Sequence, residues 1–260
     1  MMQLGFSSMG QPELSLEECE NLAIECGADF LELRVLEGSL DLPAYFQSRE
    51  TKNSRVPVRL LASSLRLAEA SEADFTDFAT FGDLAHRMEV PFVRIFGGGR
   101  EGHSLTEQEL NEAVSAANRV REMIKDHQWG FEPLLETHDA FSSSSQILAL
   151  DRFLDRPLSI LWDSHHTWKL AGESLQESWA HLGPRIRHIH YKDSVTEGEA
   201  FRYVLPGKGQ FPTQQLFDLL RNEGYEEGVS LEWEKLWHPE LPPLKEAIPP
   251  FLSLSRETLI

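Results

Sequence analysis

Short apolar runs recur along the chain at a nearly regular interval, and more polar stretches with helical periodicity separate them. The runs are rich in β-branched and aromatic residues, and most are apolar on both faces. This pattern is typical of parallel strands that are buried between two layers. We place eight strands at 2–8, 29–35, 56–65, 91–98, 131–138, 158–164, 186–192 and 228–234.

The stretches between the runs carry recognisable helix starts. Ser15 with Glu18, and Thr106 with Glu109, have the spacing of capping boxes, in which side chain and backbone satisfy each other's free polar groups. In the helix predicted from residue 105, one face is formed by Leu110, Val114, Ala117, Val120 and Ile124. Further helices are expected to begin near Phe75, Ser143 and Pro212.

Eight alternations of strand and helix, which extend over about 250 of the 260 residues, predict a closed (β/α)₈ TIM barrel. A doubly wound open sheet is the alternative, but GFSSMG after the first strand is not a glycine-rich phosphate turn. The glycines of FGGGR at 96–100 favour a tight turn from strand to helix. No linker or low-complexity tract interrupts the series, so we predict a single domain over residues 1–260.

Composition indicates an ordinary globular protein, with 41% hydrophobic and 25% charged residues among 260. No apolar stretch approaches the roughly 20 residues that a membrane span requires, and the N-terminal stretch lacks the features of a signal peptide. Cys19 and Cys26 form no metal or redox motif and are expected to be reduced thiols. We therefore expect a cytoplasmic protein that does not bind membranes.

The charge of the chain argues against one class of partner. There are 42 acidic residues against 24 basic ones, which gives a formal net charge of −18. Binding to a phosphate backbone requires a basic surface, so nucleic acid is not an expected partner.

Four of the apolar runs end in clusters of acidic residues and histidines: LETHD at 135–139, WDSHH at 162–166, HIHYKD at 188–193 and LEWE at 231–234. In a TIM barrel the C-terminal ends of the strands meet at one mouth. Glu136, Asp163, His190 and Glu232 should therefore lie together there. Trp162 and Trp233 have the opposite parity and should pack against the outer helices.

Three carboxylates and one imidazole form an oxygen-rich ligand set for one divalent ion. Mn²⁺ or Mg²⁺ suits this set best, and Co²⁺ or Zn²⁺ is possible. Without a cation between them, the buried carboxylates would repel one another by several kcal/mol. Taken singly, Asp163 could instead cap a helix, and His190 could be a hydrogen-bonded core residue; the four together favour a metal site.

The four motifs, in this order, resemble those of the xylose isomerase-like TIM barrels, a superfamily of sugar phosphate isomerases and epimerases that also contains endonuclease IV. PGKGQFP at 206–212 resembles the turn that precedes the seventh helix of that family. The resemblance implies that Glu136, Asp163, His190 and Glu232 bind the metal.

The resemblance also implies substrate contacts for His138, His166 and Lys192, and more loosely for Arg202 in the loop after the seventh strand. It assigns no role to His165 or His188. The three-metal set of the endonucleases needs more histidines in the first half of the chain, where His86 and His103 end no strand.

These residues predict a metal-dependent isomerase or epimerase of a small ketose or sugar phosphate, in which the ion stabilises an enediolate. Glu136 and Glu232 would remove and return the carbon-bound proton. An inosose-type dehydratase, a metal-dependent endonuclease and a catalytically silent carbohydrate-binding barrel are the alternatives. The sequence does not identify the sugar, the metal or the oligomeric state, although a homo-oligomer is compatible with it.

Overall fold

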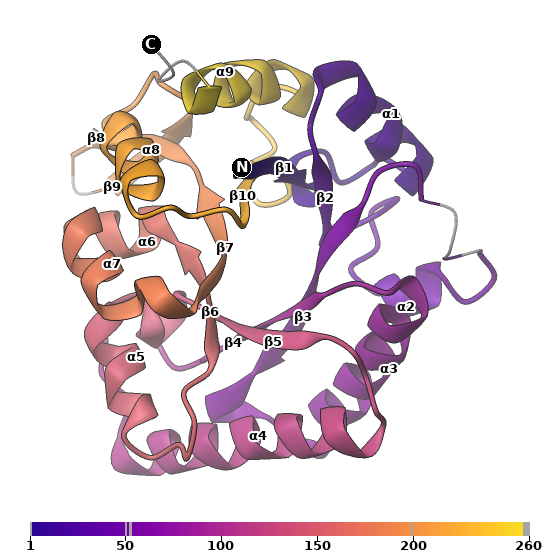
Figure 1. Ribbon diagram of the computed structural model, residues 1–260, viewed down its shortest axis with the longest axis vertical. Helices are drawn as coiled ribbons and strands as arrows, with labels where there is room; N and C mark the ends of the chain where they lie inside the picture. Colours follow the sequence, from indigo (N-terminus) through magenta and orange to yellow (C-terminus); the bar gives the residue numbers. More distant parts are fainter. Residues whose placement is uncertain (1, 50, 52–53, 199, 257–260) are drawn as a thin grey trace.

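The computed structural model describes residues 2–49, 51, 54–198 and 200–256, which form a closed parallel β-barrel surrounded by helices (Figure 1). Around the barrel the strand order is β1, β10, β7, β6, β5, β4, β3, β2. The strands are β1 Gln3–Ser7, β2 Phe30–Leu33, β3 Val58–Arg66, β4 Phe92–Phe96, β5 Glu132–Glu136, β6 Ser159–Asp163, β7 Ile186–Tyr191 and β10 Gly228–Leu231. Each predicted run overlaps one of them, so the predicted TIM barrel is confirmed.

The barrel closes between its first and last strands. β1 pairs with β10 in parallel, with Gln3 opposite Gly228 and Phe6 opposite Leu231. Closure leaves no free sheet edge in the barrel. Because all the barrel strands are parallel, their C-terminal ends lie at the same mouth.

The helices cover the outside of the barrel (Figure 1). They are α1 Leu16–Cys26, α2 Leu42–Tyr45, α3 Glu72–Met88, α4 Glu107–Asp126, α5 Ser144–Asp151, α6 Ser164–Lys169, α7 Leu175–Leu182, α8 Thr213–Asn222 and α9 Leu244–Arg256. The capping boxes predicted at Ser15 and Thr106 are both present. No helix among the described residues has the length and apolar character needed to cross a membrane.

One element was not predicted. The segment between β7 and α8 was expected to be an inserted loop, but it contains an antiparallel hairpin, β8 Asp193–Glu197 and β9 Ala200–Val204 (residue 199 lies outside the described residues). The Asp193 carboxylate accepts hydrogen bonds from the backbone N–H groups of Gly207, Gly209 and Phe211, with N···O distances of 2.8–3.1 Å. It therefore fixes the end of the hairpin against the turn that leads to α8.

The core has two parts on opposite sides of the barrel wall. Inside the barrel, a small apolar cluster of Leu60, Ala62, Phe92, Leu134 and Leu161 lies below the mouth. Outside it, Trp162 donates to Thr167 and packs against Trp179 of α7, while Trp233 donates to the Pro242 carbonyl. The predicted outward direction of both tryptophans is confirmed, which leaves the opposite strand faces for the interior.

The glycine-rich stretch after β4 forms the tight turn that the sequence predicted. Gly98 and Gly99 have φ angles of +83° and +76°, a backbone conformation that residues other than glycine rarely adopt. The Gly99 N–H donates to Glu69, so this turn binds a carboxylate of the chain itself.

Candidate metal centre

Four side chains meet at the mouth of the barrel because each follows the inward face of its strand to the C-terminal end. Glu136 and Asp163 are the last residues of β5 and β6. His190 is the last residue but one of β7, and Glu232 directly follows β10. The four are at most 5% exposed. One ligand atom from each lies within 4.8 Å of the others. The structure thus brings together the four residues that the sequence singled out.

His190 lies in the middle of the group. Its Nδ1 is 3.3 Å from Glu136 Oε1, 3.2 Å from Glu232 Oε2 and 4.0 Å from Asp163 Oδ2. Burial alone would lower the pKa of His190, but the charges of Glu232 and Glu32 raise it well above its usual value. In the absence of an ion, His190 is therefore a cation among carboxylates.

Three buried atoms of this group have no hydrogen-bond partner in the described part of the chain: Glu136 Oε1, Asp163 Oδ2 and His190 Nδ1. Buried polar atoms are nearly always paired, so three such atoms in one place require an explanation. A divalent ion would satisfy all three at once. The residues present fit such an ion, since three carboxylates and one imidazole suit Mn²⁺ or Mg²⁺ and also accept Zn²⁺ or Co²⁺.

The second oxygen of Glu136 is held by an arginine that the sequence analysis did not identify. Arg94 of β4 donates from Nη1 to Glu136 Oε2 over 2.6 Å, and its other guanidinium nitrogens donate to the Ser63 carbonyl. Burial alone would raise the pKa of Glu136, but the Arg94 charge and His190 lower it to about 2. Glu136 is therefore ionised and held from one side, which leaves Oε1 directed at His190.

Lys192 neutralises the opposite side of the group. Its buried Nζ lies 2.5 Å from Glu232 Oε2, 2.5 Å from Glu234 Oε1 and 2.8 Å from Asp163 Oδ2. Although burial opposes its charge, the carboxylates of Asp163 and Glu232 raise the pKa of Lys192 well above its usual value. Burial raises the pKa of Asp163 to about 7, in spite of the nearby ammonium group.

Asp163 caps a helix, which is one of the two roles that the sequence left open, and it also belongs to the candidate ligand group. It is the N-cap residue of α6, and its Oδ1 accepts from the His166 backbone N–H over 2.9 Å. Its Oδ2 is the atom that lies near Lys192 and has no hydrogen-bond partner among the described residues. A helix cap therefore positions a candidate ligand.

Two histidines line the rim beside Asp163. His166 is buried, and its Nδ1 lies 3.1 Å from the Thr137 carbonyl, so this nitrogen carries the proton if it hydrogen-bonds there. Burial, with a contribution from Lys192, lowers the pKa of His166 well below its usual value. The ring of His138 packs edge-on against His166, and 35% of the His138 side chain is exposed. His138 is thus the more accessible of the two rings.

Arg202 is not brought to this group. It lies on β9, its Nε is 2.9 Å from Glu197 Oε1, and 53% of its side chain is exposed. His165, for which the sequence suggested no role, contacts the same hairpin: its Nε2 lies 2.8 Å from Ser194 Oγ, and its ring packs against Phe201 and Tyr203. It therefore links α6 to the hairpin. His86 and His103 are both exposed.

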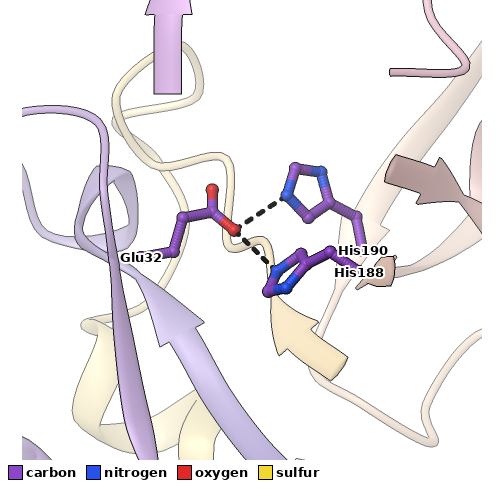
Figure 2. A group of neighbouring side chains, drawn as sticks. All are labelled: Glu32, His188 and His190. Carbon is purple, nitrogen blue, oxygen red and sulfur yellow. Dashed lines mark hydrogen bonds and ion pairs between the residues drawn. The ribbon is translucent and has the colours of Figure 1, made fainter. Parts of the chain in front are cut away.

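A further carboxylate, that of Glu32 on β2, lies beneath His190. Figure 2 shows its Oε2 directed at two imidazoles, with distances of 2.9 Å to His190 Nε2 and 3.2 Å to His188 Nε2. Ser230 donates to the same oxygen over 3.0 Å. Burial alone would raise the pKa of Glu32, but His190 and His188 hold it below its usual value.

The sequence contained a signal for Glu32 and Arg94, the two site residues that the sequence analysis did not identify. Glu32 and Arg94 are the single charged residues of the strands FLEL at 30–33 and FVRIF at 92–96. Each lies on the face of its strand that points into the barrel, and each is at most 3% exposed. A charge in the middle of a strand that is buried on both faces needs a partner within the barrel.

Comparison with known proteins gives the same fold. A profile described as "Xylose isomerase-like TIM barrel" matches residues 21–252. The structure is similar to that of a probable 3-DHS dehydratase, AsbF, involved in petrobactin synthesis from Bacillus anthracis, with 20% identity, a TM-score of 0.79 and coverage of 99% of this chain and 100% of that one.

Two further solved structures are similar at comparable levels. An IolI protein with a bound zinc atom has 17% identity and a TM-score of 0.78, with 98% of this chain and 99% of that one covered. An L-ribulose 3-epimerase has 18% identity and a TM-score of 0.72, with 99% and 95% covered. At these identities the structures establish the fold alone. No curated protein sequence is similar enough to add a relative.

Proposed function

The chain belongs to the xylose isomerase-like TIM barrel family, and from this premise we propose that it is a divalent-metal-dependent isomerase or epimerase of a small ketose or related sugar. One observation carries the proposal: three carboxylates and an imidazole converge at the barrel mouth, and three of their buried atoms lack a hydrogen-bond partner among the described residues. A bound ion would supply the positive charge that stabilises an enediolate of the substrate.

Glu136 and Glu232 are the proposed bases for proton transfer at the reacting carbon. Both extend from their strand ends toward Nδ1 of His190. Arg94 binds the second oxygen of Glu136, and Lys192 binds the Glu232 oxygen that faces His190. Although burial alone would raise their pKa values, nearby positive charges keep both below the usual range, so both are ionised at neutral pH. Two carboxylate bases suit epimerisation, which needs a base on each face.

The remaining polar side chains at the mouth are proposed to bind substrate hydroxyls. The rings of His138 and His166 pack against each other, and both His166 Nδ1 and Lys192 Nζ lie close to Asp163 Oδ2, at 3.2 Å and 2.8 Å. Arg202 would first have to leave its ion pair with Glu197. A small carbohydrate is the proposed partner, and a strongly acidic chain makes nucleic acid a poor alternative.

The test combines metal binding with solvent exchange. Protein stripped by a chelator is titrated with Mn²⁺, Mg²⁺, Co²⁺ and Zn²⁺, and one ion per chain should raise its melting temperature, because a ligand that binds only the folded state stabilises it. The loaded protein is then incubated with a panel of ketoses and aldoses in deuterated buffer. Deuterium at the carbon next to the carbonyl, with a change of epimer or isomer, supports the proposal. Absence of binding for all four ions contradicts it.

Dehydration of a cyclic ketone is a second candidate, because Lys192 places an ammonium group beside the same carboxylates. After removal of the proton next to the carbonyl, that group could protonate a departing hydroxyl as water. The product would be a conjugated enone. Ultraviolet absorbance that grows during turnover would identify this reaction, whereas an epimerase would produce none.

A further inference from the structure

The His190 imidazole presents its two nitrogens to two different groups of acids. Nδ1 lies 3.2–3.3 Å from the nearest oxygens of Glu232 and Glu136 but makes no hydrogen bond within the described chain. Nε2, on the far side of the ring, lies 2.9 Å from Glu32 Oε2 (Figure 2). The ring is fully buried, so the protein itself must determine which nitrogen bears a proton when an ion binds.

We propose that Glu32 is a positioning residue that holds the His190 proton on Nε2 and thereby directs the Nδ1 lone pair at the bound ion. The inference rests on the proposed function of the site. An imidazole can bind a metal only through a nitrogen without a proton, and the other nitrogen then needs an acceptor. Within the described residues, Glu32 Oε2 is the one acceptor that bonds to His190 Nε2.

Glu32 is itself fixed by its neighbours, which makes it suited to orient another ring. The same oxygen receives His188 Nε2 at 3.2 Å and the Ser230 hydroxyl at 3.0 Å. Ser230 Oγ also lies 2.6 Å from His188 Nε2, so these three side chains form a closed set beneath His190. His188, to which the sequence gave no role, thus orients the residue that orients His190.

The experiment compares Glu32→Ala, Glu32→Gln and a control variant by calorimetric titration with Zn²⁺. Removal of a carboxylate behind a metal-bound histidine typically weakens metal affinity by about 10- to 100-fold, and we expect this for Glu32→Ala. Glu32→Gln retains an oxygen that accepts the Nε2 proton and should lose less than about tenfold. The control is Glu20→Ala, because Glu20 is a similarly buried carboxylate on α1 that bonds to Ser54 and Arg55 outside the barrel. It should leave Zn²⁺ affinity unchanged.

A second readout does not depend on affinity. Long-range ¹H–¹⁵N spectra of Zn²⁺-loaded protein labelled in histidine should show the His190 proton on Nε2 in the wild type and in Glu32→Gln. Circular dichroism shows whether each variant is folded, and if Glu32→Ala does not fold, Glu32→Gln and the wild-type spectrum still decide. A proton on Nδ1 in the loaded wild type overturns the inference, as does wild-type affinity in folded Glu32→Ala.

The proposed function can fail separately. If the wild type binds no divalent ion, both proposals fall; if it binds one and Glu32→Ala binds it equally well, only this inference falls. Two Zn²⁺ ions per chain, one of them lost in Glu32→Ala, would also overturn it, because Glu32, His188 and His190 would then bind a second ion themselves.

Discussion

The two halves of the barrel contribute unequally to the charged group at the mouth. The second half contributes the carboxylates of Glu136, Asp163 and Glu232. It also contributes the ammonium group of Lys192, which follows β7, whereas β4 of the first half contributes the guanidinium group of Arg94. The carboxylates stand at strand ends within recognisable motifs, but Arg94 lies within its strand. The second half thus carries the candidate ligands and one cation that balances them, and the first half carries a second cation, which pairs with Glu136.

This difference corrects one step of the sequence analysis. The carboxylates were expected to repel one another unless a cation lay between them. The structure supplies cations from the chain itself: Arg94 on Glu136, Lys192 on Asp163 and Glu232, and His190 between the carboxylates. The group can therefore fold before an ion binds, and the proposed ion would contribute to chemistry and stability more than to folding.

The largest expected effect comes from removing the cation that the first half supplies. Arg94→Met leaves the buried Glu136 carboxylate without its guanidinium partner, which should lower the free energy of unfolding by about 3–5 kcal/mol. Urea denaturation measures this. The double variant Arg94→Met with Glu136→Gln removes both charges and should regain part of the loss. A single-variant loss below about 1 kcal/mol would mean that the halves do not balance each other.

The next largest effect separates roles within the acidic half. Glu136→Gln and Glu232→Gln keep an oxygen ligand but lose the base, so turnover should fall by about 10²-fold or more while metal is still bound. Asp163→Asn should instead weaken metal binding, with activity partly recovered at high metal concentration. Steady-state kinetics at several metal concentrations distinguishes the two patterns. Equal behaviour of all three variants would contradict separate roles.

A smaller effect concerns pH. An ion binds Asp163 and His190 only without their protons, and the pKa of Asp163 is raised to about 7 by burial, while acidic neighbours raise that of His190 despite its burial. Metal affinity should therefore fall as pH decreases from about 8 to 6, by roughly 10- to 100-fold per pH unit for one or two displaced protons. Calorimetric titration in buffers of different ionisation enthalpy counts those protons. Asp163→Asn should release one fewer, and affinity that is independent of pH would contradict the assignment.

The smallest effect is expected at Arg202, which lies on the hairpin and not on a barrel strand. Its pair with Glu197 is about half exposed, so Arg202→Ala should change the free energy of unfolding by less than about 1 kcal/mol. If Arg202 also contacts substrate, KM should rise and Arg202→Lys should restore it in part. Unchanged KM in both variants would restrict substrate contacts to the barrel interior and its rim.

The sequence predicted the parts of the molecule that depend on local pattern. Strand periodicity located all eight barrel strands, and motif spacing located Glu136, Asp163, His190 and Glu232. The partnership between Glu32 and His190 could not be predicted in this way, because strand tilt and register determine which side chains meet across a barrel. The hairpin was missed for a related reason, since its strands are short and pair only with each other.

The pairing of β1 with β10 has a consequence for the order of folding. Glu232 follows β10, the last barrel strand to be synthesised, and it reaches His190 only when β10 lies between β7 and β1. A chain that has not closed its ring thus lacks the fourth ligand. A bound ion would bridge β5, β6, β7 and β10, so that reopening of the ring at β10 would first require release of the ion. Metal binding would then slow unfolding far more than it accelerates folding, so the ion would increase the kinetic stability of the closed barrel.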